Sequence, residues 1–264
     1  MSVRTIDLTS VSPEEVRQAC EEVGFLTVVG HGVDGDLVDE VAARSRAFFD
    51  LPDAEKERFR GPAETRGLPV YRPLGAETLG ANADRKASLD WGPSLTGVAW
   101  PNAELRAAYE RYYAEMQRVA GTLVAAFGAA LGRDLASEFD DRSSSLRVID
   151  YPADGGAGAR AGAHRDYGCL TIIRSDAPGL EVQTRSGRWL AVQPPAGGFV
   201  VNIGDLMQFW TAERWVSTLH RVVGEDDAPR RQSLVFFHNP RADAVINGVR
   251  AEDYILARAA EAGL

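Results

Sequence analysis

Residues 162–168 read Gly162-Ala163-His164-Arg165-Asp166-Tyr167-Gly168 and bear on both the fold and the chemistry of this chain. They place His164 and Asp166 two positions apart at the start of an expected strand, where side chains at that spacing project from the same face. An imidazole nitrogen and a carboxylate oxygen both suit a divalent ion of borderline or hard character. The pair therefore predicts two ligands of one metal, although His-x-Asp also arises by chance in surface turns.

Another histidine, His220, lies at the start of a later expected strand, beyond the intervening residues 167–219. In a double-stranded β-helix an early and a late strand become neighbours at the mouth of the barrel, so the three side chains can converge there. Two histidines and one carboxylate on one face of an octahedral ion leave positions open for ferrous chemistry. A closed structural zinc site would need a fourth protein ligand, and none is evident in the sequence.

The second half of the chain has the pattern of a mainly β protein. Short runs of β-forming residues alternate with turn residues, and many short strands at close spacing favour a barrel or a two-sheet jelly roll over a parallel α/β sheet. The expected strands cover residues 146–151, 169–174, 179–184, 189–193, 198–203, 206–210, 219–223 and 232–238.

The first half of the chain is expected to cover this core. Ser12 and Asn102 can act as N-caps of two of the helices, and residues 61–102 lack a sustained period and are expected to wrap the core as an ordered loop or lid. The expected elements are helices over 13–23, 35–49 and 102–131 and a strand over 25–29. The predicted fold class is mainly β with flanking helices: a double-stranded β-helix (jelly roll, cupin-like) core with an N-terminal α/β cover.

Composition narrows the class of protein further. The formal net charge of -9 repels the phosphate backbone of nucleic acids, and no run of Lys or Arg offsets it. No stretch approaches the roughly 18 apolar residues that a membrane span requires, and the start of the chain lacks the apolar segment of a signal peptide. We expect a cytoplasmic protein with a small-molecule substrate and without nucleic-acid or membrane partners, and the oligomeric state is not predicted. The preference for arginine over lysine suggests GC-rich coding and a bacterial source.

Arg231 and Ser233 form a candidate anchor for a carboxylate. Arg231 directly precedes the expected strand over 232–238, and Ser233 lies within it. At a spacing of two in extended chain, both side chains project from one face. A guanidinium binds a carboxylate through two parallel hydrogen bonds while a nearby hydroxyl donates to the same group. The pair would hold one end of a dicarboxylate, although Arg-x-Ser is also common at solvated strand edges.

The combination of His164-x-Asp166, His220 and Arg231-x-Ser233 resembles the Fe(II)/2-oxoglutarate-dependent dioxygenases of the isopenicillin N synthase-like family. The resemblance implies that His164, Asp166 and His220 bind Fe(II). It extends over nearly the whole chain, because further motifs occur in the order of the family. These motifs are Gly30-His31-Gly32-Val33, Phe48-Phe49-Asp50-Leu51-Pro52, Tyr151-Pro152, Leu170-Thr171, Asn202-x-Gly204-Asp205, Trp210-Thr211 and Phe236-Phe237-x-Asn239-Pro240.

The resemblance also implies the cosubstrate and the organisation of the chain. Arg231 and Ser233 would hold the distal carboxylate of 2-oxoglutarate, with Tyr151 assisting. An N-terminal dioxygenase region over 1–100 would pack on a catalytic core over 101–264, and the two would form one structural unit. With O2, 2-oxoglutarate would yield succinate and CO2 while a small molecule is hydroxylated, desaturated or cyclised, by analogy in bacterial secondary metabolism. The candidate substrate residues are Tyr71, Arg72, Ile173, Ser175, Leu180, Phe237 and Asn239.

Two alternatives stay open at this point. One is an iron oxidase of the same family, like isopenicillin N synthase or aminocyclopropane carboxylate oxidase, which does not consume 2-oxoglutarate and aims its Arg-x-Ser pair at the substrate. The other is a non-catalytic, cupin-like protein in which a metal only stabilises the fold. The two remaining histidines, His31 and His238, are expected to have structural roles.

Overall fold

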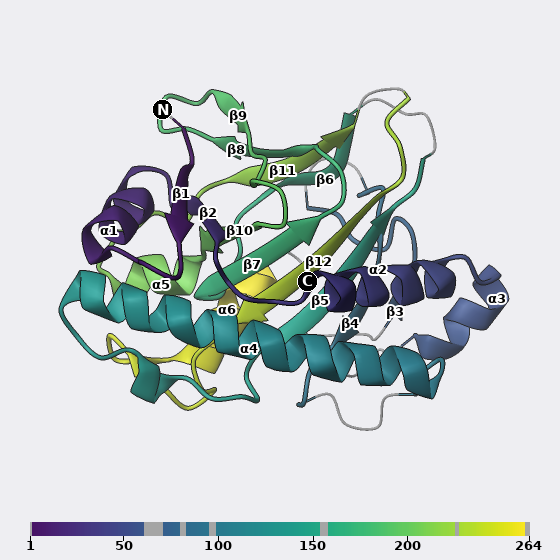
Figure 1. Cartoon of the computed structure of the whole chain (residues 1–264), viewed down its shortest axis with the longest axis horizontal. Coiled ribbons are helices and arrows are strands. Elements are labelled where there is room, and N and C mark those ends of the chain that lie inside the picture. The colour runs from purple at the N-terminus through teal and green to yellow at the C-terminus, as the bar shows by residue number, and fades with distance from the viewer. Residues whose placement is uncertain are drawn as a thin grey trace.

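The computed structural model describes residues 2–60, 71–79, 83–94, 99–153, 158–224 and 227–261. In this part of the chain two β-sheets face each other, and helices cover the outer face of the larger sheet (Figure 1). None of the described helices is both long and apolar enough to span a membrane.

The larger sheet has eight strands, and the N-terminal part of the chain supplies strands at both of its edges. At one edge β1 and β2 pair in parallel, while at the other β3 and β4 continue the sheet beyond β5. The spatial order is β1 (Arg4–Asp7), β2 (Phe25–Val29), β10 (Phe199–Ile203), β7 (Leu170–Ser175), β12 (Arg231–His238), β5 (Ser145–Tyr151), β4 (Ala87–Trp91) and β3 (Tyr71–Arg72).

The smaller sheet has four strands. Apolar side chains of both sheets meet between them, among them Ile173 and Val235 from the larger sheet and Val182 and Val222 from the smaller one. Two facing sheets with flanking helices confirm the predicted fold class, a double-stranded β-helix. The spatial order of the smaller sheet is β6 (Gly158–His164), β11 (His220–Gly224), β8 (Leu180–Gln183) and β9 (Trp189–Ala191).

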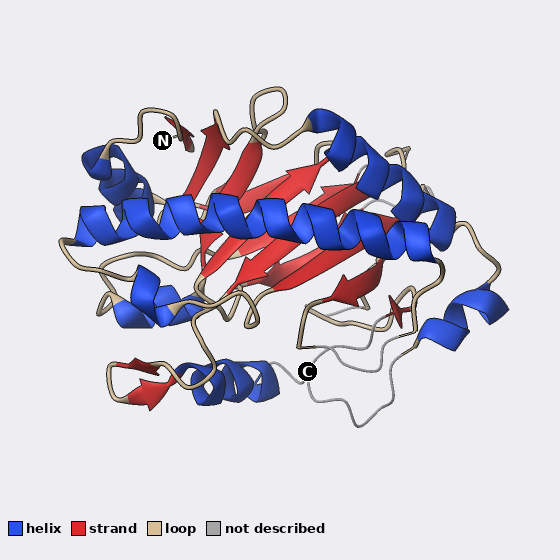
Figure 2. Cartoon of the chain, turned by 60° about the horizontal axis from the view of Figure 1, so that its bottom comes forward, coloured by secondary structure: helices blue, strands red, loops and turns tan. Residues whose placement is uncertain are grey.

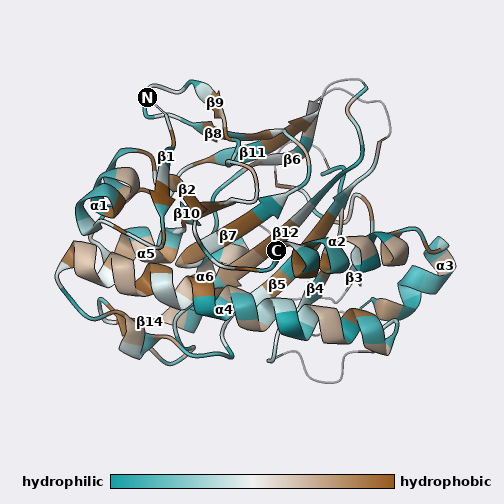
Figure 3. Cartoon of the chain, in the orientation of Figure 1, coloured by the Kyte–Doolittle hydropathy of each residue, from teal (hydrophilic) through white to brown (hydrophobic). Residues whose placement is uncertain are grey.

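The helices pack on the outer face of the larger sheet, whose central strands are largely hydrophobic (Figures 2 and 3). The longest helix begins after Asn102, whose side chain accepts a hydrogen bond from the backbone N–H of Leu105 at 2.7 Å. It ends at Gly132, which has a φ of 69° that a residue without Cβ adopts at low cost. The helices are α1 (Pro13–Glu22), α2 (Gly35–Phe49), α3 (Asp53–Lys56), α4 (Ala103–Leu131), α5 (Asp205–Trp210) and α6 (Ala251–Glu261), and the small strands β13 (Val245–Ile246) and β14 (Val249–Arg250) precede α6.

The prediction of a strand over 206–210 is wrong, because these residues belong to the helix α5. A short apolar run has no periodicity that separates a buried strand from a buried helix. Tertiary contacts favour the helix here, since the backbone N–H of Asp205, at its start, donates to the carbonyl oxygen of Asp166 at 2.7 Å. The next N–H, of Leu206, donates to the carbonyl oxygen of Gly168 at 3.1 Å.

Several strands form where none was predicted: the short strands β1, β3, β13 and β14, and the longer β4 and β6. β6 is rich in glycine and alanine, which have low β propensity, and it is stabilised by pairing with β11. β4 lies inside the stretch 61–102 that was predicted to be a loop or lid, of which residues 61–70, 80–82 and 95–98 lie outside the described residues. Because β6 ends at His164, Asp166 follows a strand instead of starting one, and the same-face argument for this pair is wrong.

A buried network of charged side chains, which we call the ionic network, joins β3, β4 and β5. Glu77, which is only 5% exposed, pairs with Arg72, with Lys86 at 3.1 Å and with Arg147 at 3.3 Å. Arg147 also pairs with the fully buried Asp90 at 2.7 Å. Removing one partner from such a network leaves a buried charge without compensation, which is strongly destabilising.

Burial by itself would raise the pKa of Glu77, but the charges of Arg147, Lys86 and Arg72 outweigh burial and lower this pKa to about 2. In the unfolded chain the ordinary value is 4.5. The stabilisation that ionised Glu77 provides is therefore fully present above about pH 4.5, and it is lost as the pH falls toward 2.

We expect Glu77→Gln to be less stable than the wild type at pH 7, and the difference in the free energy of unfolding should shrink between pH 4.5 and 2. The linkage predicts a change on the order of 3 kcal/mol across that window. Urea unfolding at a series of pH values measures it, with Glu110→Gln in an exposed pair as control. A difference for Glu77→Gln that stays constant through this window would contradict the assignment.

Candidate metal centre and carboxylate pocket

Three side chains with metal-ligating atoms converge between the two sheets. His164 ends β6 and His220 begins β11, and these two residues lie directly opposite each other in the β6–β11 pair. Asp166 reaches the same point from the loop after β6. One oxygen of its carboxylate, Oδ1, lies 3.9 Å from Nε2 of His164 and 3.8 Å from Nε2 of His220. The candidate ligand atoms all lie within 4.8 Å of one another, so the structure brings the predicted trio together.

Backbone carbonyl groups determine which nitrogen of each imidazole faces the centre. Nδ1 of His164 lies 2.8 Å from the carbonyl oxygen of Gly162, and Nδ1 of His220 lies 3.0 Å from that of Thr218. A carbonyl oxygen can only accept a hydrogen bond, so each Nδ1 carries a proton, and in the neutral imidazole Nε2 is then the nitrogen with the lone pair. Both histidines therefore direct Nε2, the nitrogen that can bind a metal, toward Asp166.

The carboxylate of Asp166 is oriented in a complementary way. Its Oδ2 atom accepts hydrogen bonds from the amide of Asn202 at 2.7 Å and from the hydroxyl of Thr171. The other carboxylate oxygen, Oδ1, therefore faces the two imidazoles. Sequence reasoning gave no role to Thr171 or Asn202, although Asn202 stands out as a polar residue in the otherwise apolar strand β10.

Electrostatics favour the neutral form of His164 and the ionised form of Asp166. Burial, and after it the neighbouring His220, lower the pKa of His164 well below its ordinary value. Burial would raise the pKa of Asp166, but the two imidazoles and the hydrogen bonds from Asn202 and Thr171 outweigh it, and this pKa lies below the ordinary range. A donor set of two imidazoles and one carboxylate fits Fe(II), with coordination positions left for other ligands.

Arg231 is a buried cation near the start of β12. It is 1% exposed, and its guanidinium lies 5.0 Å from the ring centre of Tyr151, its partner across the β5–β12 pair. The two terminal nitrogens donate to the hydroxyl of Ser233 at 2.6 Å and to that of Ser175 at 2.8 Å. Within the described ranges no carboxylate forms an ion pair with Arg231.

A buried guanidinium without an acidic partner is costly, because neutral hydroxyls and carbonyls replace only part of its hydration. Consistently, burial lowers the pKa of Arg231. The arginine, Ser175 and Ser233 form a cluster of donors that would be compensated by an incoming carboxylate, and hydroxyl groups can rotate to donate to it.

The predicted substrate residues lie in different surroundings. Ile173 and Leu180 belong to the apolar layer between the sheets, and the ring of Phe237 lies 5.8 Å from the guanidinium of Arg147. The side chain of Asn239 accepts a hydrogen bond from the backbone N–H of Cys169 at 3.2 Å.

The other three candidates, Tyr71, Arg72 and Ser175, lie outside the apolar layer between the sheets. Tyr71 packs on Phe48 in the cluster on the helix side of the larger sheet, with ring centres 5.5 Å apart. Arg72 belongs to the ionic network, and Ser175 lies at Arg231.

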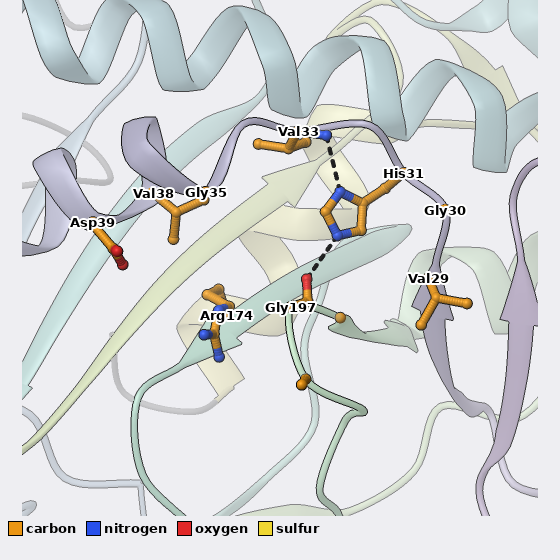
Figure 4. A pocket seen from close by; sticks show the side chains of 11 residues that line it. Val29, Gly30, His31, Val33, Gly35, Val38, Asp39, Arg174 and Gly197 are labelled. Carbon is orange, nitrogen blue, oxygen red and sulfur yellow. Dashed lines mark hydrogen bonds between the residues drawn. The ribbon is translucent and has the colours of Figure 1, made fainter.

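The remaining histidines, for which structural roles were expected, form hydrogen bonds elsewhere, and neither belongs to the convergent trio. Figure 4 shows His31 at the rim of a separate pocket of about 400 Å³, between Val33 and Gly197. Its Nε2 donates to the carbonyl oxygen of Gly197 at 2.8 Å, and its Nδ1 accepts from the N–H of Val33 at 3.1 Å. His238 is hydrogen-bonded to the hydroxyl of Ser144 at 2.8 Å.

Comparison with known proteins gives concordant matches along the chain. A family model described as "non-haem dioxygenase in morphine synthesis N-terminal" matches residues 5–112, and one described as "2OG-Fe(II) oxygenase superfamily" matches residues 142–240. A 2-oxoglutarate-dependent dioxygenase of Didymella fabae is 30% identical, over 87% of this chain and 80% of the relative. Gibberellin 20 oxidase 1 of rice is 34% identical, over 88% of this chain and 68% of the relative.

A solved structure extends the likeness to three dimensions. JOX2 in complex with 2OG, Fe and JA superposes with a TM-score of 0.80 at 28% sequence identity, and the match covers 94% of this chain and 78% of JOX2. The second family model spans the convergent trio as well as Arg231 and Ser233.

Thr171→Val removes one hydrogen bond to Asp166 while keeping the shape of the side chain. Loss of such an outer partner typically costs about 10–100-fold in metal affinity. We therefore expect Co(II), titrated by its visible absorption bands, to bind at least about 10-fold more weakly than to the wild type. Thr122→Val, on an exposed part of α4, is the matched control. Equal affinities of the two variants would show that Thr171 does not orient the carboxylate.

Proposed function

The chain belongs to the 2OG-Fe(II) oxygenase superfamily, and on this premise we propose that His164, Asp166 and His220 bind Fe(II) for the oxidation of a small molecule. The enzyme is an oxidoreductase that uses Fe(II), 2-oxoglutarate and O2. The observation that carries the site assignment is the convergence of two Nε2 atoms on a carboxylate oxygen that accepts no hydrogen bond from the described residues.

Iron, when bound, supplies the redox chemistry with O2 that protein side chains lack. His164, Asp166 and His220 would hold the ion, and three protein ligands would leave coordination positions available to small molecules. The carbonyl oxygens of Gly162 and Thr218 keep the imidazoles in the ligating tautomer, and Asn202 keeps Asp166 ionised and oriented.

Arg231, Ser233 and Tyr151 are proposed to hold the distal carboxylate of 2-oxoglutarate. The support for this role is the buried guanidinium without an acidic partner, since a bound carboxylate would neutralise it. Ser175 was a candidate substrate residue, and its hydroxyl lies 2.8 Å from the guanidinium, so we assign it to this pocket too. The protein is acidic overall, with a net charge of -9, and the local positive charge has to attract the anion against that field.

The substrate is proposed to be a small organic molecule that is hydroxylated, desaturated or cyclised. Of the candidate residues, Phe237 lies on β12, the strand that begins with Arg231, and Asn239 directly follows this strand. The ring of Phe237 lies near Arg147 of the ionic network, to which Arg72 also belongs. A role in bacterial secondary metabolism is proposed by analogy, from the small size and the arginine-rich composition of the chain, while the two relatives named above come from a fungus and a plant.

The alternative of a same-family oxidase that does not consume 2-oxoglutarate would direct Arg231 at a substrate carboxylate. Family membership favours 2-oxoglutarate use and an enzyme over this alternative and over a non-catalytic metal protein. Succinate release tests the proposal directly: the wild type with Fe(II), 2-oxoglutarate and O2 should form succinate, and His164→Ala should not. Succinate formation by His164→Ala at the wild-type rate, with Fe(II) bound, would overturn the ligand assignment.

Arg231→Lys keeps the charge but loses the bidentate fork. We expect the KM for 2-oxoglutarate to rise about 10–100-fold, because hydrogen bonds to a charged group contribute about 1.5–3 kcal/mol. Binding of 2-oxopentanoate, which lacks the distal carboxylate, should change little, as measured by competition. Arg230→Lys, on the neighbouring and more exposed arginine, is the control. An equal loss of affinity for both oxo acids would argue against a contact with the distal carboxylate.

A further inference from the structure

Asp84 lies in the N-terminal part of the chain, and one oxygen of its carboxylate touches the strand that carries His164. Its Oδ1 atom accepts a hydrogen bond from the backbone N–H of Gly162 at 2.8 Å. The carbonyl oxygen of the same glycine accepts the hydrogen bond from Nδ1 of His164, also at 2.8 Å. Gly162 is thus held by Asp84 on one side and holds the imidazole on the other.

The backbone at Gly162 needs such a partner because the strand is irregular there. His164 lies opposite His220, but Ala161 lies opposite Val222, so two residues of β6 face a single residue of β11. This is the arrangement of a β-bulge, which leaves a backbone group outside the ladder and redirects the next side chains. The N–H of Gly162 donates to the carboxylate of Asp84 instead of to a backbone carbonyl of β11.

Asp84 is itself fixed by buried charge. It is 2% exposed, and its other oxygen pairs with the ammonium group of Lys86 at 2.8 Å. Lys86 also pairs with Glu77 at 3.1 Å, and the backbone N–H of Asp84 donates to the carbonyl oxygen of Glu77 at 2.8 Å. A carboxylate held at this many points has little freedom to move, so it can define the position of the strand it touches.

We propose that Asp84 is a positioning residue for the metal ligand His164, acting through the bulge at Gly162. The inference rests on the proposed metal site. It links the ionic network, and with it β3 and β4 from the N-terminal part of the chain, to the geometry of the metal ligands in the core. Asp84 does not reach the metal ligand atoms and takes no direct part in the reaction.

Three substitutions separate this role from a general effect on stability. Asp84→Asn keeps an oxygen that can accept from Gly162 and removes the charge. Asp84→Glu keeps the charge for Lys86 but displaces the acceptor by one methylene. Asp90→Asn is the matched control, because Asp90 is fully buried in the same ionic network and pairs with Arg147 and Arg72 instead of Gly162.

The readout is binding of Co(II) to the full-length chain, followed by visible absorption and by the paramagnetically shifted N–H resonances of the two ligating imidazoles. We expect Asp84→Glu to bind Co(II) about 10-fold or more weakly, within the range for lost outer partners, and to shift the resonance of one imidazole while leaving the other in place. Asp84→Asn and Asp90→Asn should stay within about 3-fold of the wild type.

Wild-type affinity and unshifted resonances in Asp84→Glu would overturn the inference, as would an equal loss of affinity in Asp90→Asn. If Asp84→Glu fails to fold, Asp84→Ala, which removes the acceptor of Gly162, should bind Co(II) about 10-fold or more weakly than Asp90→Ala, and equal affinities of these two variants would overturn the inference. Failure of the proposed metal site gives a different result: the wild type would not bind Co(II), or His164→Ala would bind it as tightly as the wild type.

Discussion

His164 and His220 occupy directly opposite positions where β6 and β11 pair, and the candidate metal centre depends on this register. A shift of one residue in either strand would turn one imidazole to the other face of the sheet. The register is not protected by intrinsic strand propensity, because β6 is rich in glycine and alanine. It is instead maintained by neighbours: β11 on one side, and the carboxylate of Asp84 at the bulge.

The candidate metal centre and the Arg231 pocket differ in how their buried polar groups are paired. In the three proposed metal ligands, Asp166 and the two histidines, each polar side-chain atom that does not face the centre has a partner, so each residue presents one atom that can bind a metal. At Arg231 a cation is buried with only neutral partners among the described residues. The first arrangement prepares a cation site and the second an anion site, which matches a metal and a carboxylate cosubstrate held side by side in one fold.

Much of the fold could be predicted from local sequence. The long helix α4 has a cap at Asn102 and a terminating glycine at Gly132, and most strands of the core are short β-rich runs between turns. The exceptions have a common cause. The apolar run that forms α5 carries no decisive period, and its helix is stabilised by N–H groups that bond to the loop of Asp166. β6 has little strand propensity and forms because it pairs with β11.

By itself the sequence determined the donor types of the site: two histidines, one aspartate and an arginine followed two positions later by a serine, all within a mainly β region. Only the tertiary structure decided which atoms of those side chains face one another. The proton positions on His164 and His220 follow from carbonyl groups, the free oxygen of Asp166 follows from Asn202 in a distant strand, and the link from Asp84 crosses from the N-terminal part of the chain. Hydrogen bonds are directional and join residues far apart in sequence, so their pattern is fixed only when the sheets have packed.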